Sequence, residues 1–361
     1  MKIEMQLTTG VPDTFRTVAA RSMYNVLPEQ ARTHEIKADV PLEDRPWTIG
    51  LVVGPSGSGK TSIGSKLGSV WTGCEWSNTK AIIDEVGGAS TDDAAAALAA
   101  VGLGTVPAWL RPFHVLSGGE KFRAELARIL LAPTGGAPVV YDEFTSVVDR
   151  VVAQVGAGAF AKAWRRRPDG SKFVALACHY DIEEWLQPDW VLDTSDWTFR
   201  WGALQRRPKI EIEVHEAPRE AWALFAPHHY LKAGLPAGKF YVAMAMGRPV
   251  AHVALTTAPP DASGRFPQRL TRLVVMPEWQ GAGIGIAFLE AVAKHAWSGG
   301  YKPCKSLAIH TSHPGLIAAL SRRPNWTRVR SKIGENSSSK NQKNGHGRGF
   351  LRAVSGFAWR P

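Results

Sequence analysis

The stretch that most constrains the fold of this chain is GPSGSGKT, at residues 54–61. It follows an apolar run, residues 47–53, that predicts a buried strand, and it precedes residues 62–70, which predict a helix. Glycines at such a junction allow successive backbone N–H groups to point into one concavity, and the helix N-terminus adds the positive end of its dipole. This arrangement predicts a phosphate-binding loop, or P-loop, rather than a glycine-rich turn without a ligand.

The side chains at the end of this loop have predicted roles. Lys60 can reach the β- and γ-phosphates of a nucleotide, and the hydroxyl of Thr61 can ligate Mg²⁺. The residues that we expect to bind the nucleotide are Gly54, Pro55, Ser56, Gly57, Ser58, Gly59, Lys60, Thr61 and Ser62.

The length of the chain, 361 residues, is too great for one ordinary core and suggests two domains. A hydrophobic content of 44% and a charged content of 21% are typical of a soluble globular protein. No apolar run approaches the roughly 18–20 residues that span a bilayer, and no secretory signal is visible at the N-terminus. The three cysteines lie far apart, without metal-ligand spacing, and indicate reduced thiols. We therefore expect a cytoplasmic protein with no membrane partner.

The net charge of +11 is concentrated near the C-terminus. Residues 321–361 contain ten lysines and arginines and a single acidic residue, Glu335. A basic surface of this kind attracts polyanions, so nucleic acid is a predicted partner. The alternative is a solvated basic face that only aids solubility.

Three further stretches of the first half carry chemistry. Residues 116–120, LSGGE, stand before a helix-period run, and a serine and two glycines at a helix N-terminus form a second anion-binding surface. Residues 138–143 predict a buried strand that ends in two acids, of which Asp142 can hold Mg²⁺ through its water shell and Glu143 can polarise an attacking water. Residues 172–179 predict a strand that ends with a histidine.

The other parts of the first half predict supporting elements. Residues 1–46 are weakly patterned and predict edge strands, with Tyr24 as a candidate to stack on adenine. Residues 81–86 predict a strand, and Ser90 predicts the N-cap of a helix. Residues 193–208 predict a terminal hairpin followed by a domain junction.

The P-loop, LSGGE, a strand ending in Asp-Glu, a Ser-x-x-Asp loop at residues 146–149 and a strand-end histidine occur in this order and resemble an ABC-type ATPase over residues 1–208. The resemblance implies that Glu143 is the catalytic base of ATP hydrolysis and that His179 senses the γ-phosphate. It places Mg²⁺ at Thr61 and Asp142. The residues of the LSGGE signature that it assigns to ATP binding are Ser117, Gly118, Gly119 and Glu120.

The resemblance also implies a homodimer. Two heads of this family sandwich two ATP molecules, and Ser117 and Gly119 would contact the ATP that a partner subunit holds. This chain has one head, so the second head would come from a second copy.

Two departures argue against a transporter ATPase. Residues 60–117 form a short segment that contains no glutamine, so the Q-loop ligand of the family is absent or replaced. The signature also ends in Glu120 rather than in glutamine. These departures favour a soluble ABC ATPase that acts on nucleic acid or in translation.

The second half of the chain starts with a period-two run, residues 209–215, that predicts a strand. Further strands are predicted at residues 240–246 and 250–256, which form a hairpin, and at residues 269–276. A second glycine-rich loop, residues 278–285, and an amphipathic helix come next. This loop has no lysine, which suits a ligand whose diphosphate is held but not cleaved.

The order Q-x-x-G-x-G in this second loop resembles the acetyl-CoA pyrophosphate loop of GNAT acyltransferases. The resemblance implies that the backbone of residues 273–275 pairs with the pantetheine arm, and that residues 305–310 form the next strand, splayed to admit the thioester. The residues that it assigns to acyl-CoA are Leu273, Val274, Val275, Gln280, Gly281, Ala282, Gly283, Ile284 and Gly285.

The proton chemistry departs from this family, because many GNAT enzymes use a tyrosine after the splayed strand to protonate the leaving thiolate, and the chain has none there. We assign this role to His313, with His310 and Ser312 as alternatives. Glu278 or His252 could serve as the base.

We therefore expect an α/β protein with a P-loop ABC-type ATPase domain at residues 1–208 and an α/β GNAT acyltransferase domain at residues 209–361, the latter with a flexible polar loop near residues 334–348. The leading hypothesis is an ATPase coupled to an acyltransferase that acts on nucleic acid, either a DNA base or a tRNA. The alternatives are a protein acetyltransferase switched by ATP, and a nucleic-acid-associated ATPase whose GNAT-like domain only binds. The expected cofactors are ATP, Mg²⁺ and acetyl-CoA or another acyl-CoA.

Overall fold

The computed structural model describes residues 2–8, 12–27, 33–73, 75–203, 210–229, 235–257, 267–298, 307–334 and 352–361. The chain divides into two compact units. Unit 1 contains Met1–Gly73, Pro133–Val147 and Trp164–Arg207, and unit 2 contains Cys74–Ala132, Val148–Ala163 and Pro208–Pro361. Unit 2 therefore takes segments from both halves of the sequence. The predicted domain boundary at residues 208–209 and residues 335–348 of the predicted polar loop lie outside the described residues.

Unit 1 is built on a six-stranded sheet with the strand order β4-β5-β6-β3-β7-β8. The strands are β3 (Ile49–Val53), β4 (Ser69–Val70), β5 (Val139–Tyr141), β6 (Phe173–Ala177), β7 (Trp190–Asp193) and β8 (Thr198–Trp201). All neighbours pair in parallel except β7 and β8, which form the predicted terminal hairpin. Strands β3 and β6 are buried at every residue, which explains why both are continuous apolar runs in the sequence.

The helix after the P-loop is shorter than predicted. Helix α2 (Lys60–Leu67) ends where the chain passes close to the neighbouring strand, and residues 69–70 form β4 instead of continuing the helix. The amide of Ser69 donates to the carbonyl of Pro138 at 2.8 Å. A Cβ on Gly68 would stand 2.2 Å from the same carbonyl oxygen, so the close approach requires glycine. Unit 1 also contains α8 (Ile182–Leu186).

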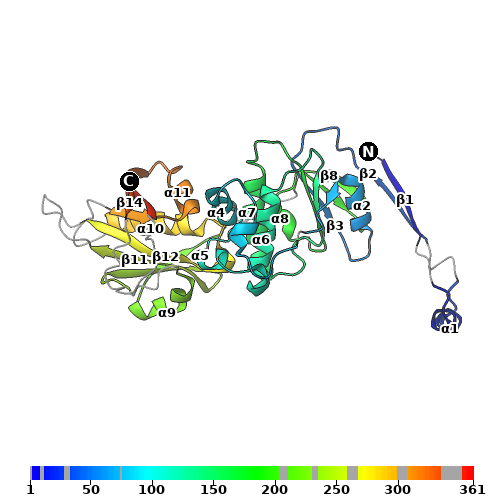
Figure 1. Ribbon diagram of the computed structural model, residues 1–361, viewed down its shortest axis with the longest axis horizontal. Coiled ribbons are helices and arrows are strands. Elements are labelled where there is room, and N and C mark those ends of the chain that lie inside the picture. Colours follow the sequence, from blue (N-terminus) through cyan, green and yellow to red (C-terminus); the bar gives the residue numbers. More distant parts are fainter. Residues whose placement is uncertain are drawn as a thin grey trace. The chain divides into compact units, whose positions relative to one another are not determined.

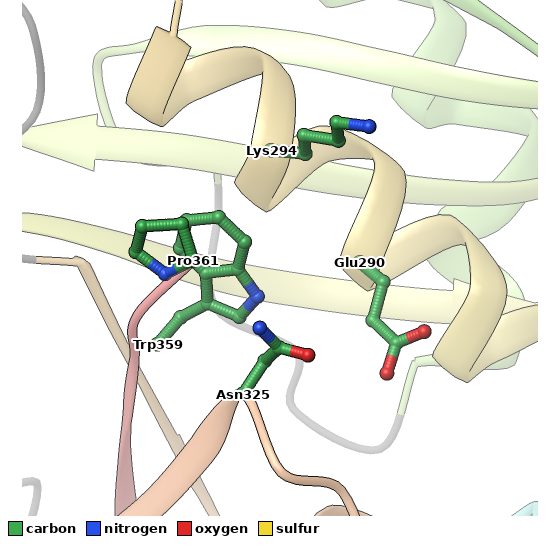
Figure 2. A pocket seen from close by; sticks show the side chains of 5 residues that line it. All are labelled: Glu290, Lys294, Asn325, Trp359 and Pro361. Atoms are coloured by element: carbon green, nitrogen blue, oxygen red, sulfur yellow. The ribbon is translucent and has the colours of Figure 1, made fainter.

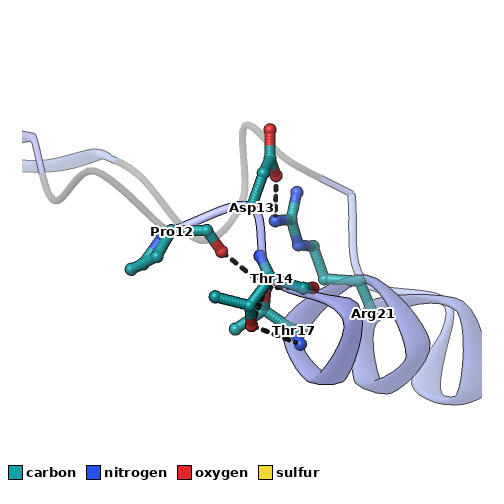
Figure 3. Close-up of polar contacts among 5 residues, drawn as sticks. All are labelled: Pro12, Asp13, Thr14, Thr17 and Arg21. Atoms are coloured by element: carbon teal, nitrogen blue, oxygen red, sulfur yellow. Dashed lines mark hydrogen bonds and ion pairs between the residues drawn. The ribbon is translucent and has the colours of Figure 1, made fainter.

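The N-terminal segment forms a small sheet of its own rather than edge strands of the six-stranded sheet. Strand β1 (Lys2–Thr8) pairs antiparallel with β2 (Thr33–Asp39), and α1 (Phe15–Tyr24) lies between them in the sequence. A capping box begins this helix: the side chain of Thr14 accepts from the amide of Thr17, and the side chain of Thr17 accepts from the amide of Thr14 (Figure 3). The weak pattern of this region had not indicated a helix.

Unit 2 is built on a seven-stranded sheet with the order β14-β15-β13-β12-β11-β10-β9 (Figure 1). The strands are β9 (Glu213–Ala217), β10 (Lys239–Ala245), β11 (Arg248–Thr257), β12 (Gln268–Val275), β13 (Leu307–Thr311), β14 (Trp326–Gly334) and β15 (Arg352–Trp359). Strands β12 and β13 pair in parallel, and the other neighbours of this sheet are antiparallel. The hairpin β10–β11 is the one that the sequence predicts.

Helices cover both faces of this sheet (Figure 1). Helix α10 (Ile284–Ser298) packs through Phe288 in the same core cluster as Ala243 of β10. Helix α9 (Trp222–Phe225) packs in a second cluster with Val242 of the same strand. Since successive residues of a strand point to opposite faces, these two helices cover opposite sides of the sheet.

Helices from the first half of the sequence complete unit 2. They are α3 (Ile82–Glu85), α4 (Thr91–Ala100), α5 (Val106–Trp109), α6 (Gly118–Leu131) and α7 (Arg150–Trp164), of which only Trp164 belongs to unit 1. Helix α4 has the predicted N-cap Ser90 and packs against both α6 and α11 (Pro314–Leu320). Single 3₁₀ turns are η1 (Phe113–Val115), η2 (Arg219–Ala221), η3 (Ala226–His228) and η4 (Pro277–Trp279).

The strand predicted at residues 81–86 is wrong, because this segment forms α3. The amide of Ile82 donates to the carbonyl of Arg111 at 3.0 Å, and its side chain is fully buried. Both carboxylate oxygens of Glu85 accept from the amide of Ser77, at 3.1 and 3.3 Å. These contacts from outside the segment override the strand preference of two adjacent isoleucines.

Candidate functional site

The P-loop lies between β3 and α2 and has the conformation that its glycines allow. Gly57 and Gly59 have φ angles of 78° and 87°, which residues other than glycine rarely adopt. A Cβ on Gly57 would have no heavy atom within 4 Å, so the loop borders open space. Lys60 is 7% exposed, and its Nζ donates to the carbonyls of Gly54 at 2.9 Å and Pro55 at 2.6 Å. This open cradle with an ammonium group fits a phosphate chain.

The two residues predicted to hold Mg²⁺ are in contact with each other. The hydroxyl of Thr61 donates to Oδ2 of Asp142 at 2.6 Å. A hydroxyl and a carboxylate suit Mg²⁺, which takes its remaining ligands from water and phosphate. The described residues contain no group of three or more His, Cys, Asp or Glu that could hold a metal ion. The pair therefore fits a metal shared with a bound nucleotide rather than one in an all-protein cage.

The six-stranded sheet brings the other predicted ATP residues to the same edge. Strands β5, β6 and β3 are parallel neighbours, so the segments that follow them lie at their common carboxyl edge. Glu143 follows β5, has a φ of 54° and donates its amide to Oδ1 of Asp142 at 2.8 Å. His179 follows β6, and both Glu143 and His179 are exposed. Tyr24, the candidate for adenine stacking, is 74% exposed at the end of α1.

The signature residues form the start of α6 in unit 2. Ser117 is the N-cap: its Oγ accepts from the amide of Glu120 at 3.3 Å, and Oε2 of Glu120 accepts from the amide of Ser117 at 2.9 Å. Glutamate and glutamine serve such a capping box equally, so the departure at this position leaves the helix start unchanged. Ser117 and Gly118 are exposed, which leaves this helix N-terminus open to an anion.

The second glycine-rich loop joins β12 to α10. Gly281 and Gly283 have φ angles of 93° and 88°. A Cβ on Gly283 would have no heavy atom within 4 Å, so a side chain there would enter open space. Gly285, in the first turn of α10, lies against Val275, whose Cγ2 would be 3.1 Å from an added Cβ. The loop is an open cradle at the N-terminus of a 15-residue helix, which fits a diphosphate.

Strands β12 and β13 separate beside this loop. They pair at three positions only, from Gln268 with Leu307 to Leu270 with Ile309, although β12 continues to Val275. Among the described strands, the rest of β12 pairs with β11 alone. The pairing of β12 with β13 therefore ends at Leu270 and Ile309, and we call the place where it ends the wedge.

The side chain of Gln280 bonds to other groups of the protein. Its Oε1 accepts from the amide of Gly104 at 2.8 Å, and its Nε2 donates to the carbonyl of Val275 at 2.8 Å and to the hydroxyl of Thr105 at 3.2 Å. The side chain thus holds the loop in place, and only its backbone can face a diphosphate. The carbonyl of Val275, which we expected to pair with the pantetheine arm, already has this partner.

His313 is the N-cap of α11. Its Nδ1 accepts from the amide of Leu316 at 3.3 Å, and its Nε2 lies 3.1 Å from the carbonyl of Gly104, to which it donates. Both ring nitrogens are thus engaged, and burial lowers the pKa of His313. In this structure the neutral imidazole holds α11 against the residues after α4, and the acid role of His313 stays a prediction.

Residues 180–322 match the model of the acetyltransferase (GNAT) family. Part of the chain thus matches the GNAT model, and the motifs of the first half resemble those of an ABC-type ATPase. The GNAT match covers the loop at Gly283 and most of the seven-stranded sheet. Of the ABC-like motifs, the P-loop and the Asp-Glu strand end lie in unit 1, whereas the LSGGE signature lies in unit 2. No match was found among curated protein sequences.

Solved structures of both kinds resemble parts of the chain. The ATP-binding cassette MJ0796, a dimeric post-hydrolysis state with ADP and Pi, is 14% identical with a TM-score of 0.38, over 56% of this chain and 98% of that one. An IAA acetyltransferase from Bacillus cereus is 18% identical with a TM-score of 0.31, over 41% and 99% of the two chains. A GNAT acetyltransferase from Elizabethkingia anophelis with acetyl-CoA bound is 17% identical with a TM-score of 0.29, over 42% and 98%.

The GNAT part contains two further histidines that are candidates for proton transfer. His252 of β11 is fully buried, its Nδ1 lies 3.3 Å from the carbonyl of Arg272, and its Nε2 has no hydrogen-bond partner among the described residues. Burial lowers the pKa of His252, which favours the neutral imidazole. Desolvation, with a smaller effect of Arg269, lowers the pKa of His310 on β13.

The sequence analysis missed one residue of the GNAT part's surroundings, Arg123 of α6. This side chain is 3% exposed, and it donates through Nη1 to the carbonyls of Gly102 and Pro277 and through Nη2 to the carbonyl of Glu278 at 3.0 Å. One sequence feature could have indicated that this arginine is buried: it stands between Phe122 and Ala124 in the predicted helix. An arginine in that setting is usually exposed along its charged end, so the pattern alone carries little weight.

A hollow of about 310 Å³ lies beside α10. Figure 2 shows the side chains that line it, which are Glu290, Lys294, Asn325, Trp359 and Pro361. None of them belongs to the glycine-rich loop or to the predicted sites, so we give this hollow no part in acyl transfer. No helix among the described residues is long and apolar enough to cross a membrane.

Proposed function

We propose that this protein hydrolyses ATP and transfers an acyl group from acyl-CoA to an amine of a nucleic acid. The observation that carries the proposal is the presence of two open phosphate cradles, one at Gly57 and one at Gly283, where an added Cβ would meet nothing. The first has a lysine and a magnesium-binding pair, as cleavage of a phosphate bond requires. The second has neither, which suits a diphosphate that is only held.

In the proposed ATPase site, residues of this chain bind the nucleotide and orient the water molecule that attacks it. The ammonium of Lys60 would exchange the loop carbonyls for phosphate oxygens, and Thr61 with Asp142 would hold Mg²⁺, which neutralises phosphate charge when bound. Glu143 would orient water and accept its proton while the oxygen of that water bonds to the γ-phosphorus and ADP leaves. His179 would donate a hydrogen bond to the γ-phosphate.

The homodimer belongs to the same proposal. The exposed N-terminus of α6, at Ser117 and Gly118, would meet the γ-phosphate of ATP on a second copy of the chain. ATP would then join two subunits, and hydrolysis would release them.

In the GNAT part, the wedge between β12 and β13 would admit the thioester. The amine nitrogen attacks the carbonyl carbon, the bond from that carbon to sulfur breaks, and the amine loses a proton while the thiolate gains one. His252 is in the neutral form that a base needs, and its Nε2 has no partner among the described residues. Of the two candidate bases, Glu278 and His252, we therefore propose His252.

Nucleic acid is the acceptor class that the charge favours. The net charge is +11, and Arg322, Arg323 and Arg360 lie exposed on unit 2. A basic surface raises the local concentration of a polyanion and gives binding that falls steeply with salt.

The test is transfer of a labelled acetyl group from acetyl-CoA by the full chain, with ATP and Mg²⁺, to tRNA, to duplex DNA and to a protein mixture. Label in either nucleic acid is the expected result. Label in protein alone would move the acceptor to another class. Binding of acetyl-CoA without any transfer would make the GNAT part a recognition module beside the ATPase.

A further inference from the structure

One buried arginine connects the signature helix to the acyl-CoA loop inside unit 2. Arg123 of α6 donates to the carbonyls of Pro277 and Glu278, which stand just before the loop, and to the carbonyl of Gly102 at 2.8 Å. Its side chain is 3% exposed. Burial lowers the pKa of Arg123 to about 10, so the guanidinium is still charged at neutral pH.

The guanidinium of Arg123 donates to three carbonyl oxygens through Nη1 and Nη2, and the carboxylates of Glu278 and Glu120 favour its charged form through space. A buried guanidinium is costly unless its donors are satisfied. A movement of the backbone at residues 277–278 away from α6 would leave a buried charge without these acceptors. The base of the acyl-CoA loop and α6 are therefore expected to move together.

A second set of contacts clamps the residues after α4 to the same loop. Gln280 accepts from the amide of Gly104 and donates to the hydroxyl of Thr105. The backbones also meet directly, because a Cβ on Gly102 would stand 2.2 Å from the carbonyl oxygen of Gln280. His313 donates to the carbonyl of Gly104 at 3.1 Å. Contacts on three sides thus leave the loop little freedom to shift independently.

Helix α6 begins at the signature. Arg123 is five residues after Gly118, which is about 7.5 Å along the helix axis at 1.5 Å per residue. The capping box of Ser117 and Glu120 stabilises this end of a 14-residue helix. The backbone hydrogen bonds of a helix keep its turns at a fixed spacing, so we expect a shift at the N-terminus of α6 to carry Arg123 with it.

We propose that Arg123 and Gln280 are positioning residues that couple ATP binding at the signature to acyl-CoA binding at the loop of residues 281–285. The inference rests on the proposed function, in which the N-terminus of α6 closes on ATP. When the site closes on ATP, α6 moves. Residues 277–278 move with it because their carbonyls are bonded to the guanidinium of Arg123. Gln280, which follows them, then changes the position of the loop at Gly283. By linkage, each ligand must then change the affinity of the other by the same factor.

The test uses the full chain with Glu143→Gln, so that ATP is retained. The dissociation constant of acetyl-CoA is measured by calorimetry with and without ATP and Mg²⁺, and we expect a change of at least about fivefold. We call the quotient of the two acetyl-CoA dissociation constants, with and without ATP, the ratio. Arg123→Met should bring this ratio to about one, while ATP and acetyl-CoA each still bind when the other is absent. The matched control is Arg128→Met, which removes an arginine that stacks on Trp76 at 4.2 Å from the same helix, and it should keep the ratio.

A second variant covers the case in which Arg123→Met fails to fold, as judged by thermal melting. Arg123→Lys keeps a positive charge but loses the forked geometry that reaches three carbonyls at once. The ratio should therefore fall to about one in this variant too. The reciprocal measurement is ATP affinity with and without acetyl-CoA. In the parent protein, which carries only Glu143→Gln, acetyl-CoA must change the affinity for ATP by the same factor by which ATP changes the affinity for acetyl-CoA.

The outcomes separate this inference from the proposed function. A ratio that survives in a folded Arg123 variant overturns the coupling through this residue. The absence of any ATP effect in a parent that binds both ligands also overturns the coupling but leaves the two binding sites intact. A parent that fails to bind ATP or acetyl-CoA refutes the proposed function itself.

Discussion

The hydroxyl of Thr61 donates to the carboxylate of Asp142 at 2.6 Å, although 81 positions separate the two residues in the sequence. We predict that Asp142→Asn raises the Mg²⁺ concentration for half-maximal ATP turnover about 10- to 100-fold, because the amide gives the hydrated ion no negative charge. A magnesium titration of ATP turnover checks this. Asp196→Asn, in the exposed turn of the β7–β8 hairpin, is the control and should need no more Mg²⁺ than the wild type. Equal requirements in both variants would remove Asp142 from the metal site.

Glu143 stands exposed directly after β5 and next to Asp142. Glu143→Gln should lower the turnover number of ATP hydrolysis by about 10²- to 10⁴-fold, because an amide cannot accept the proton of the attacking water. ATP binding should be retained, since the P-loop contacts are untouched. Turnover is measured by phosphate release and binding by a fluorescent ATP analogue. Wild-type turnover in this variant would falsify the assignment of the base, and the exposed Glu211→Gln serves as the control.

Gly283 and Gly136 offer a matched pair of glycines. Their φ angles are 88° and 85°, and an added Cβ would meet nothing within 4 Å at either position. Glutamate at each site therefore brings the same backbone strain, but only Gly283→Glu places a carboxylate in the predicted diphosphate cradle. We expect Gly283→Glu to lose acetyl-CoA binding in calorimetry and Gly136→Glu to keep it. Equal affinity in the two variants would mean that acyl-CoA does not use this loop.

The stability of unit 2 should fall in acid. The pKa values of His252, His310 and His313 are all lowered from 6.5, mainly by burial. The unfolded chain therefore binds more protons than the folded chain as the pH drops below about 6.5, so stability is complete above that pH and declines below it. Melting temperatures between about pH 7.5 and about pH 5 measure the slope.

A histidine variant identifies the source of this slope. His313→Asn keeps an N-cap for α11 but removes one of the three imidazoles whose pKa is lowered, so the melting temperature should depend less on pH. His215→Asn, at an exposed position of β9, should leave the slope as it is. An unchanged slope in His313→Asn would show that this ring does not contribute.

Local patterns predicted much of the fold. The hairpin of residues 240–256 and the helix after the second glycine loop follow from alternation, turn residues and helical periodicity, which act over a few residues. The prediction of a strand at residues 81–86 was wrong because contacts with Ser77 and Arg111 decide that segment. The helix at residues 15–24 has no buried residue and thus no apolar face that a pattern could reveal.

The sequence by itself determined the two glycine-rich loops. Such a loop needs only its own backbone and the adjoining strand and helix, so the backbone conformation at Gly57 and Gly283 can be predicted from consecutive residues. The order of the ABC motifs was visible for the same reason, because each one ends a strand or begins a helix.

The tertiary structure alone decided how the side chains around these cradles are used. Gln280 was predicted from its motif to serve acyl-CoA, and His313 from its place to donate a proton, yet both bond to Gly104, more than 170 positions away. Arg123 reaches the carbonyl of Pro277 across 154 positions. Such contacts depend on which buried donors find acceptors once distant segments pack together, and no local pattern encodes that choice.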